Sequence, residues 1–335
     1  MTDEILLEIQ HNFPLTSRPF LDIGNKFGIS EDEVIEILNK QKSEGIIRQT
    51  SAIFDTKKLG YKSSLVAFEI DEKDIEDATT LINSHPGISH NYLRSHKFNV
   101  WFTIALPPNS KLTLDRTIDF LAAKTNAKNY LILPTIKMFK IAVKLDTTKN
   151  KSIKEEVVQK THTAIELNEE YYQIIELLQK DIEFTKEPFK YIIDTLGISY
   201  ERLFEACGEL LSSGVMRRFA SILNHKKAGF GSNAMVVWEI DEEMAGEIGK
   251  QAASFSSISH CYLRPVYKEW KYNLFTMIHA QSSQELQNII ETIASEIEFK
   301  SNMILHSLKE FKKVRIIYFS NEFDKFEQRI LNEIS

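Results

Sequence analysis

The sequence predicts an α+β protein built from two tandem copies of one module. Each copy is a helix-turn-helix (winged-helix-like) unit followed by a ferredoxin-like βαββαβ unit. Two observations lead to this prediction. The chain of 335 residues repeats itself at about half its length, and within each half the apolar spacing changes from the period of helices to the period of strands.

The repeat is clearest in two pairs of segments. Residues 45–61 match residues 214–230 from a Gly-Ile-Ile-Arg or Gly-Val-Met-Arg start to a Lys-Lys-x-Gly-aromatic end. Further along, Ile-Ser-His-Asn-Tyr-Leu-Arg at 88–94 matches Ile-Ser-His-Cys-Tyr-Leu-Arg at 258–264. A period this long excludes a solenoid. We therefore expect two homologous halves joined by a linker at 147–165, a polar stretch rich in Lys and Thr.

Each half opens with three helices, in which apolar residues recur at three- and four-residue spacing. In the first half we expect them at 3–10, 18–27 and 30–43, and Ser30 followed by Glu33 is a capping-box pattern that begins the third. The second half repeats this plan with helices at 169–180, 186–196 and 199–213.

Strands and helices in ferredoxin-like order follow. The first half predicts, in order, a strand at 64–70, a helix at 74–83, strands at 90–94 and 99–106, a helix at 112–124 and a closing strand at 136–143. The second half predicts a strand at 234–240, a helix at 242–254, and at its end a helix at 283–297 and a strand at 312–319. The expected domains are helix-turn-helix units at 1–48 and 166–216, ferredoxin-like units at 49–146 and 217–320, and a C-terminal tail at 321–335.

The composition is that of an ordinary globular protein. Hydrophobic residues make up 43% of the chain and charged residues 26%, and 12 glycines with 8 prolines are too few for a disordered or fibrous chain. Its two cysteines, Cys207 and Cys261, cannot form a disulfide framework, and no Cys/His cluster has the spacing of a structural zinc site. No apolar run approaches the roughly 20 residues that span a bilayer. We therefore expect a cytoplasmic protein in a reducing compartment, without membrane contact.

The most informative local motif is His-x-Tyr-x-Arg, which occurs in both halves on a predicted strand. Because strand side chains alternate between faces, His260, Tyr262 and Arg264 project from one side of the sheet. The motif recurs at His90, Tyr92 and Arg94. Such a row of polar groups suits a binding site, but it equally suits a hydrogen-bonded polar network between two sheets.

Cations gather at the first predicted strand of the second half. Arg217, Arg218, His225 and Lys226 lie close together with apolar residues interleaved, which suits a flat ligand with several carboxylates. Solvated lysines on a hairpin are the alternative. In the first half Arg48 matches Arg217, but the positions of Arg218 and His225 hold a glutamine and a threonine. We therefore expect the second half to carry the working site.

A longer loop in the second half adds aromatic and cationic side chains beside the His260 strand. Residues 266–272 replace only four residues of the first half, and Tyr267, Trp270, Lys271 and the following Asn273 are candidate binding residues. The alternative is a simple hairpin tip.

The helix-turn-helix units test a DNA-binding interpretation. A recognition helix needs cations or amides to contact phosphates and base edges. Residues 1–50 instead hold nine acidic side chains against five basic ones, and the net charge of the chain is −6. We expect that these units do not bind DNA.

The order of the units resembles that of the Lrp/AsnC regulators, and the motifs look like those of the siroheme decarboxylases. The resemblance rests on Gly-Ile-Ser-His-Asn-Tyr-Leu-Arg with Phe-Asn-Val-Trp-Phe-Thr in the first half. In the second half it rests on Arg-Arg-Phe-Ala-Ser-Ile-Leu-Asn-His-Lys-Lys-Ala-Gly-Phe, Ser-His-Cys-Tyr-Leu-Arg-Pro and Tyr-Asn-Leu-Phe-Thr-Met-Ile-His. Residues 1–146 resemble the A-type subunit and 166–320 the B-type subunit, so the chain looks like a fusion whose halves pack together, with a homodimer left open.

The resemblance implies a carboxy-lyase that converts siroheme to 12,18-didecarboxysiroheme by loss of CO2 from two acetate groups, in the alternative haem or haem d1 pathway. No cofactor is implied beyond the iron of the substrate. A regulator of the Lrp/AsnC type, binding a small ligand and DNA, is the alternative function.

Residue roles follow from the implied chemistry. Loss of CO2 leaves a carbon that must be protonated, and a histidine, with an unperturbed pKa of about 6.5, is a suitable donor. The candidate acids are His260 and His225, with Tyr262 as a lesser one, and either histidine is also a candidate ligand of the siroheme iron. The substrate-binding candidates are Arg217, Arg218, Arg264, Lys226, Tyr267, Trp270, Lys271 and Asn273, and a second, pseudo-symmetric pocket would contain Arg48, His90, Tyr92 and Arg94.

Overall fold

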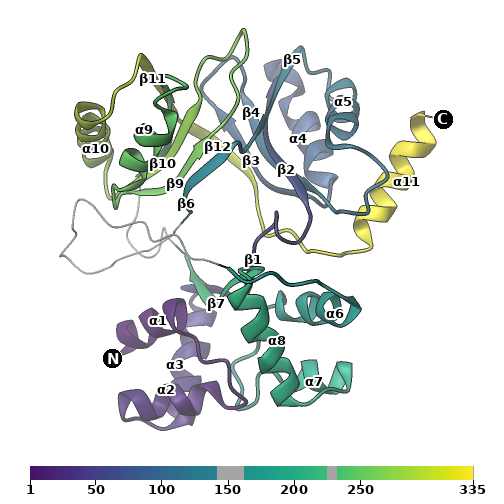
Figure 1. Ribbon diagram of the computed structural model, residues 1–335, viewed down its shortest axis with the longest axis vertical. Coiled ribbons are helices and arrows are strands. Elements are labelled where there is room, and N and C mark those ends of the chain that lie inside the picture. The colour runs from purple at the N-terminus through teal and green to yellow at the C-terminus, as the bar shows by residue number, and fades with distance from the viewer. Residues whose placement is uncertain (142–161, 225–231, 335) are drawn as a thin grey trace. The chain divides into compact units, whose positions relative to one another are not determined.

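The structure, a computed structural model, describes residues 1–141, 162–224 and 232–334 (Figure 1). The chain divides into two compact units. Unit 1 comprises Met1–Gly60, Lys160–Ala228 and Ile317–Phe319, and unit 2 comprises Tyr61–Gln159, Gly229–Ile316 and Ser320–Ser335. The predicted site residues His225 and Lys226 lie outside the described residues.

Unit 1 contains the helices of both helix-turn-helix segments. They are α1 (Thr2–His11), α2 (Pro19–Phe27), α3 (Glu31–Ser43), α6 (Glu169–Leu178), α7 (Lys190–Leu196) and α8 (Tyr200–Ser212). The predicted capping box is present, because the Ser30 hydroxyl accepts a hydrogen bond from Glu33 N–H while the Glu33 carboxylate accepts one from Ser30 N–H. Helix α7 begins four residues later than expected, after Pro188.

One antiparallel ladder joins the two halves inside unit 1. Strand β1 (Ile47–Phe54) pairs with β7 (Met216–Leu223). Residues 49–54 and 217–223 are predicted to belong to the ferredoxin-like units, but the compact units place both strands with the helices. The reason is tertiary: each strand finds its partner in the other half. Phenylalanines pack beside this ladder with ring centroids 4.9 to 6.4 Å apart, namely Phe13, Phe20, Phe184, Phe189 and Phe219.

Unit 2 contains two antiparallel five-stranded sheets. Sheet A has the order β12-β3-β4-β2-β5, with β2 (Lys62–Glu69), β3 (Ile88–Arg94), β4 (Val100–Leu106), β5 (Asn129–Pro134) and β12 (Ser307–Lys313). Sheet B has the order β11-β8-β10-β9-β6, with β6 (Lys137–Ile141), β8 (Ser232–Glu239), β9 (Ile258–Leu263), β10 (Leu274–Ala280) and β11 (Ser301–Leu305). Within each sheet, the four strands from one half have the ferredoxin-like order, which confirms the predicted fold class.

The fifth strand of each sheet comes from the other half of the chain. Strand β6 pairs with β9, and β12 pairs with β3. The prediction that residues 136–143 close the first sheet and residues 312–319 close the second is therefore wrong. The unpredicted strands β5 and β11 take those places, beside β2 and β8. Apolar spacing identifies a strand but says nothing of its partner, so this exchange could not be seen in the pattern.

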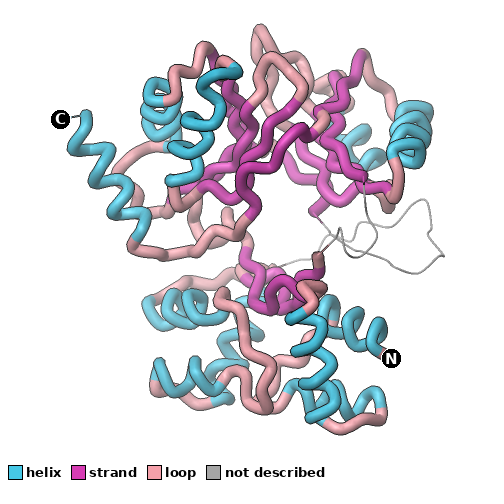
Figure 2. Tube along the Cα trace, turned by 180° about the vertical axis from the view of Figure 1, so that it is seen from behind, coloured by secondary structure: helices cyan, strands magenta, loops and turns pink. Residues whose placement is uncertain are grey.

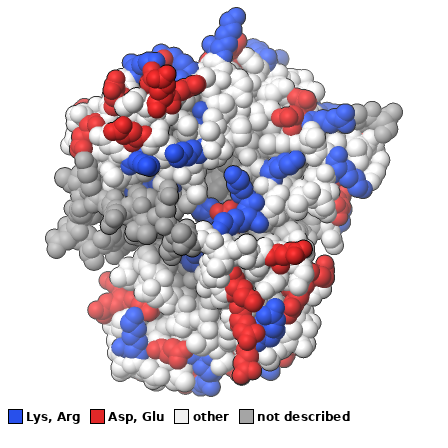
Figure 3. Space-filling model, in the orientation of Figure 1, with Lys and Arg blue, Asp and Glu red and all other residues white. Residues whose placement is uncertain are grey.

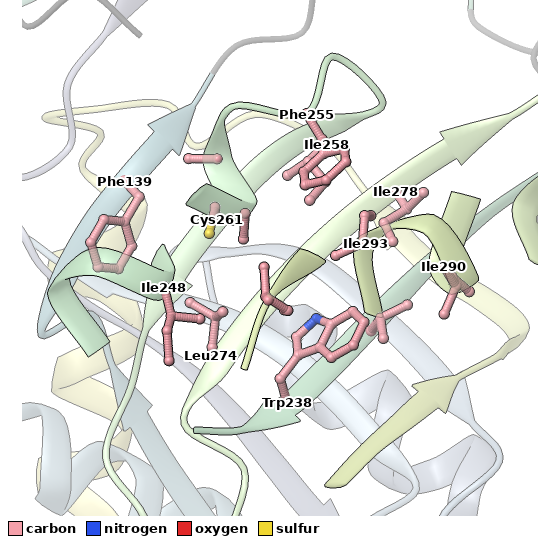
Figure 4. Close-up of a cluster of buried hydrophobic side chains, with 14 of the residues drawn as sticks. Phe139, Trp238, Ile248, Phe255, Ile258, Cys261, Leu274, Ile278, Ile290 and Ile293 are labelled. Atoms are coloured by element: carbon pink, nitrogen blue, oxygen red, sulfur yellow. The ribbon is translucent and has the colours of Figure 1, made fainter. Parts of the chain in front are cut away.

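The sheets face each other and the helices cover their outer faces. Helices α4 (Ile75–Ser84) and α5 (Leu114–Lys124) cover sheet A, while α9 (Ala245–Ala253) and α10 (Ser283–Glu296) cover sheet B (Figures 1 and 2). Figure 4 shows the core beneath α9 and α10, where Trp238 and Cys261 are fully buried. Another core lies between the two sheets and includes Trp101, Phe98 and Trp270.

The predicted C-terminal tail is a helix. Residues 322–334 form α11 (Glu322–Ile334), which packs on the helix side of sheet A. Its Phe326 lies 4.6 Å from His85, centroid to centroid, and its buried Glu327 carboxylate accepts hydrogen bonds from residues 110–112. Phe323, Phe326 and Ile330 are buried and recur at three- and four-residue spacing, which is the pattern of an amphipathic helix.

The contact with α11 depends on a neutral histidine. Gly87 N–H donates to His85 Nδ1 at 2.9 Å, so that nitrogen carries no proton. Burial lowers the pKa of His85 to about 3, with the charge of Lys312 adding to the effect. Since the unfolded chain binds a proton here at higher pH than the folded chain, this residue reduces stability as the pH falls from 6.5 towards 3.

Replacing His85 by Asn should remove this pH dependence while keeping a hydrogen-bond acceptor. Between pH 7 and pH 5, the free energy of unfolding of the wild type should fall by about 2 kcal/mol more than that of the variant. Urea denaturation at the two pH values measures the difference. Equal losses in both proteins would show that His85 is not the titrating group.

Candidate functional site

A β-bulge in β9 positions the predicted His260. In the pairing of β9 with β10, His260 lies opposite Met277 while Ile258 lies opposite Ile278, so Ser259 is one residue in excess. A bulge of this kind turns side chains out of strict alternation. It allows the side chains of Ser259 and His260 to lie together, although they are adjacent in sequence.

The Ser259 hydroxyl bridges two histidines. Its Oγ lies 2.8 Å from Nδ1 of His260 and 2.7 Å from Nε2 of His279. Tyr262 follows on the same strand, with its ring centroid 6.0 Å from that of His260. His279 is not among the residues that the sequence predicts for the site, because its contact with Ser259 depends on the pairing of β9 with β10.

The exchanged strand β6 borders this group with apolar side chains. Met138 lies opposite Tyr262, and Ile141 lies opposite His260. Directly opposed residues of antiparallel strands share a face. Met138 and Ile141 are 44% and 40% exposed, so an apolar surface lies beside the histidine and the tyrosine. This arrangement suits the face of a flat ring.

The first half has a related group with different chemistry. Ser89 is again the excess residue of a bulge, and its Oγ lies 3.0 Å from Nδ1 of His90 and 2.7 Å from Oγ1 of Thr103. Here the bordering strand is β12, which sets Lys313 opposite His90 and Glu310 opposite Tyr92. The two groups therefore differ in their second hydrogen-bond partner and in the polarity of the border.

The two arginines of the repeated motif are bound inside the protein. Arg264 is buried and donates through Nη1 to the Leu133 carbonyl of sheet A, and its guanidinium lies 5.1 Å from the Tyr262 ring. Arg94 donates in the same way to the Leu305 carbonyl of sheet B, at 2.8 Å. Burial lowers the pKa of each to about 10. These contacts favour the alternative of a polar network between sheets over the prediction of substrate binding.

The candidates from the longer loop also have internal partners. Trp270 is 2% exposed and packs against Trp101 at 5.3 Å, so it belongs to the core between the sheets and does not close a pocket. Tyr267 donates to the Ile132 carbonyl, and Lys271 pairs with Glu239 at 2.8 Å.

Asn273 holds two segments of backbone together. Its Oδ1 accepts from Ile240 N–H and its Nδ2 donates to the Ile240 carbonyl, both at 2.9 Å. Asn99 makes the same pair of bonds to Ile70 in the first half, at 3.0 and 2.7 Å. Both amides are thus occupied by backbone groups and hold the chain in place. This structural role argues against the predicted contact of Asn273 with substrate.

The predicted cations that the structure describes in unit 1 lie on the β1–β7 ladder. Arg217 pairs with Asp55 at 2.8 Å. Arg218 lies opposite Ile53, and burial, with the nearby charge of Arg217, lowers its pKa. Arg48 lies at the bulge between Ile47 and Gln49.

No group of three or more His, Cys, Asp or Glu side chains among the described residues could hold a metal ion. Nor does any helix within the described ranges have the length and apolar character needed to cross a membrane.

Comparison with known proteins gives the family. The AsnC-like ligand binding domain matches residues 58–140 and 227–312, and the siroheme decarboxylase NirDL-like HTH domain matches residues 3–48. A siroheme decarboxylase of Hydrogenobacter thermophilus is 38% identical over 330 residues, which cover 98% of each chain. The chain belongs to the siroheme decarboxylase family. It is thus related to carboxy-lyases along its whole length, which confirms the resemblance seen in the motifs.

Solved structures agree with this assignment to the siroheme decarboxylases. The crystal structure of the siroheme decarboxylase NirDL is 33% identical, with a TM-score of 0.79 and coverage of 99% of both chains. NirDL in co-complex with an iron-uroporphyrin III analogue gives the same TM-score at 32% identity. These matches support the enzyme over the regulator considered as the alternative.

Other members of the siroheme decarboxylase family are divided into subunits. The alpha subunit of Desulfovibrio desulfuricans is 36% identical, in an alignment that covers 43% of this chain and 81% of the subunit. The beta subunit of the same organism is 33% identical, in an alignment that covers 44% of this chain and 93% of the subunit. In this chain, which carries both halves, each half adds one strand to the sheet of the other, as β6 and β12 show.

Replacing Asn273 by Ala should reduce stability without a specific loss of tetrapyrrole binding. The change leaves the Ile240 backbone groups without partners, at a cost of about 1–3 kcal/mol. Asn99→Ala is the matched variant and should lose a similar amount. Urea denaturation and absorbance titration with an iron tetrapyrrole measure the two properties. A stable Asn273→Ala protein that no longer binds would restore Asn273 as a substrate contact.

Proposed function

We propose that this protein removes CO2 from two acetate side chains of siroheme and releases 12,18-didecarboxysiroheme. Full-length similarity to a named siroheme decarboxylase carries the proposal, together with similarity to NirDL, which was crystallised with an iron-uroporphyrin III analogue. The iron belongs to the substrate. We assign the reaction to the alternative haem pathway or to haem d1 synthesis.

The geometry around His260 supports this substrate. Siroheme is a flat ring whose edge carries carboxylates. The exposed Met138 and Ile141 offer an apolar surface to a ring, and His260 and Tyr262 supply polar groups at its border. A site for such a ligand needs both an apolar face and groups that orient the carboxylates.

The proposed reaction needs one proton for each CO2 released. The bond between the acetate methylene and its carboxylate breaks, the electron pair passes into the pyrrole, and CO2 leaves. Protonation of the methylene carbon then gives a methyl group. We propose His260 as the proton donor, because the contact of its Nδ1 with the Ser259 hydroxyl, at 2.8 Å, holds the ring and makes Nε2 the atom that would give the proton. Tyr262 is the secondary candidate.

The remaining assignments stay predictions. Arg217, Arg218 and Lys226 are proposed to bind carboxylates of the substrate. His225 is proposed to act as an acid or to ligate the siroheme iron. Arg217 would have to share its charge with Asp55, so Arg218 is the stronger candidate. DNA binding by unit 1 is not expected, because acidic groups are interspersed with the basic ones over its helices (Figure 3).

The proposal is tested by incubating the purified protein with siroheme without oxygen and measuring the mass of the tetrapyrrole. We expect a product lighter by two CO2 units, reached through an intermediate lighter by one. Protein that binds the pigment, shown by its absorbance, but leaves its mass unchanged would refute the assignment.

Replacing His260 by Gln should slow decarboxylation far more than it weakens binding. General acids contribute about 100-fold or more to such rates, so we expect a loss of that order in kcat with the dissociation constant little changed. His90→Gln is the matched control and should retain most of the activity, since its bordering strand is polar. Rapid-quench kinetics with product analysis measure the decarboxylation rate of each variant. Equal losses in the two variants would mean that both groups catalyse.

A further inference from the structure

The hydroxyl of Ser259 lies between two histidine rings and has only one proton to donate. It is 6% exposed and lies 2.8 Å from His260 Nδ1 and 2.7 Å from His279 Nε2. The Met277 carbonyl is 3.4 Å away, at the outer limit of a hydrogen bond. Both ring contacts are shorter than this one, so we assign the single hydroxyl proton to one of the two rings.

The two rings must accordingly play different parts. A hydroxyl that donates to one ring nitrogen can only accept from the other. If it donates to Nδ1 of His260, then His279 must donate through Nε2, and His260 carries its own proton on Nε2. This is the tautomer that a proton donor acting through Nε2 requires.

We propose that His279 acts through Ser259 as a positioning residue for His260 and supplies the proton that replaces CO2. This inference rests on the decarboxylation and on the His260 role proposed above. Neither His279 nor Ser259 needs to touch the substrate. Their part is to hold the reactive tautomer and to restore it after each step.

The proton balance of one step is complete. His260 gives its Nε2 proton to the methylene carbon, while its Nδ1 takes the hydroxyl proton of Ser259. Ser259 takes the Nε2 proton of His279, which changes from imidazolium to neutral imidazole. A proton from water then binds His260 Nε2, and the transfers run in reverse to restore His279. One proton enters for each CO2 that leaves.

The first half provides a built-in comparison. Its Ser89 contacts His90 and the hydroxyl of Thr103, which has no basic nitrogen. The residue that corresponds to His279 in the aligned strands is Ala105. The first-half group can therefore orient its histidine, but the contacts that the structure describes for Ser89 include no second imidazole to supply a proton.

The experiment compares four variants in the siroheme assay. His279→Gln keeps a hydrogen-bond donor but cannot carry the proton, and Ser259→Ala breaks both contacts. Both should lose about 10- to 100-fold in kcat while the dissociation constant for siroheme changes by less than about twofold. Ser259→Thr restores the hydroxyl and should recover most of the rate. Thr103→Val, the matched change in the first half, should leave the rate as in the wild type.

A second readout separates this inference from the proposed function. Nitrogen-15 NMR of the histidine rings identifies which nitrogen carries the proton, with or without turnover. In the wild type we expect His260 protonated at Nε2. We expect the same tautomer in His279→Gln, which keeps the donor to Ser259, and a mixture of tautomers in Ser259→Ala. Wild-type protein that shows this pattern but does not decarboxylate siroheme would refute the function alone. An unchanged tautomer in Ser259→Ala, or wild-type kcat in both Ser259→Ala and His279→Gln, would refute the proposed role of His279 and Ser259.

Discussion

The exchange of terminal strands between the two sheets of unit 2 is the constraint on which the rest of that unit depends. Because β6 lies beside β9, the side chains of Met138 and Ile141 border Tyr262 and His260, although more than a hundred residues separate them in sequence. The same exchange in reverse sets β12 beside His90. Each half supplies the four strands of its own ferredoxin-like sheet, and the other half adds the fifth strand at the edge.

Buried polar groups hold this arrangement together. Arg264 and Arg94 each reach from one sheet to a backbone carbonyl of the other, and Asn273 and Asn99 each bracket a strand end. Leaving such groups unpaired would be costly in the low-dielectric interior. Several side chains that suggested a binding site by their chemistry are therefore engaged in holding the sheets.

Pseudo-symmetry explains both the likeness and the difference of the two histidine groups. Each half has a bulge at a serine that brings its hydroxyl to Nδ1 of the next histidine. The second contact of the serine differs, being an imidazole in one half and a threonine hydroxyl in the other. The bordering strand differs as well, because Met138 and Ile141 correspond to Glu310 and Lys313. A duplicated scaffold has thus kept its backbone geometry while the chemistry of its two sites has diverged.

The sequence by itself determined the duplication, the two unit types, the family and the strand that carries His260. These depend on local signals: a long repeat, the periods of helices and strands, the Ser30–Glu33 cap and the His-x-Tyr-x-Arg motif. Only the tertiary structure decided the partner of each strand, the place of α11, the contact of His279 with Ser259 and the internal roles of Arg264, Trp270 and Asn273. The physical reason is that periodicity reports which face of an element is apolar, whereas pairing and burial depend on segments distant in the chain. The partner of a polar side chain therefore remains undetermined until the chain has folded.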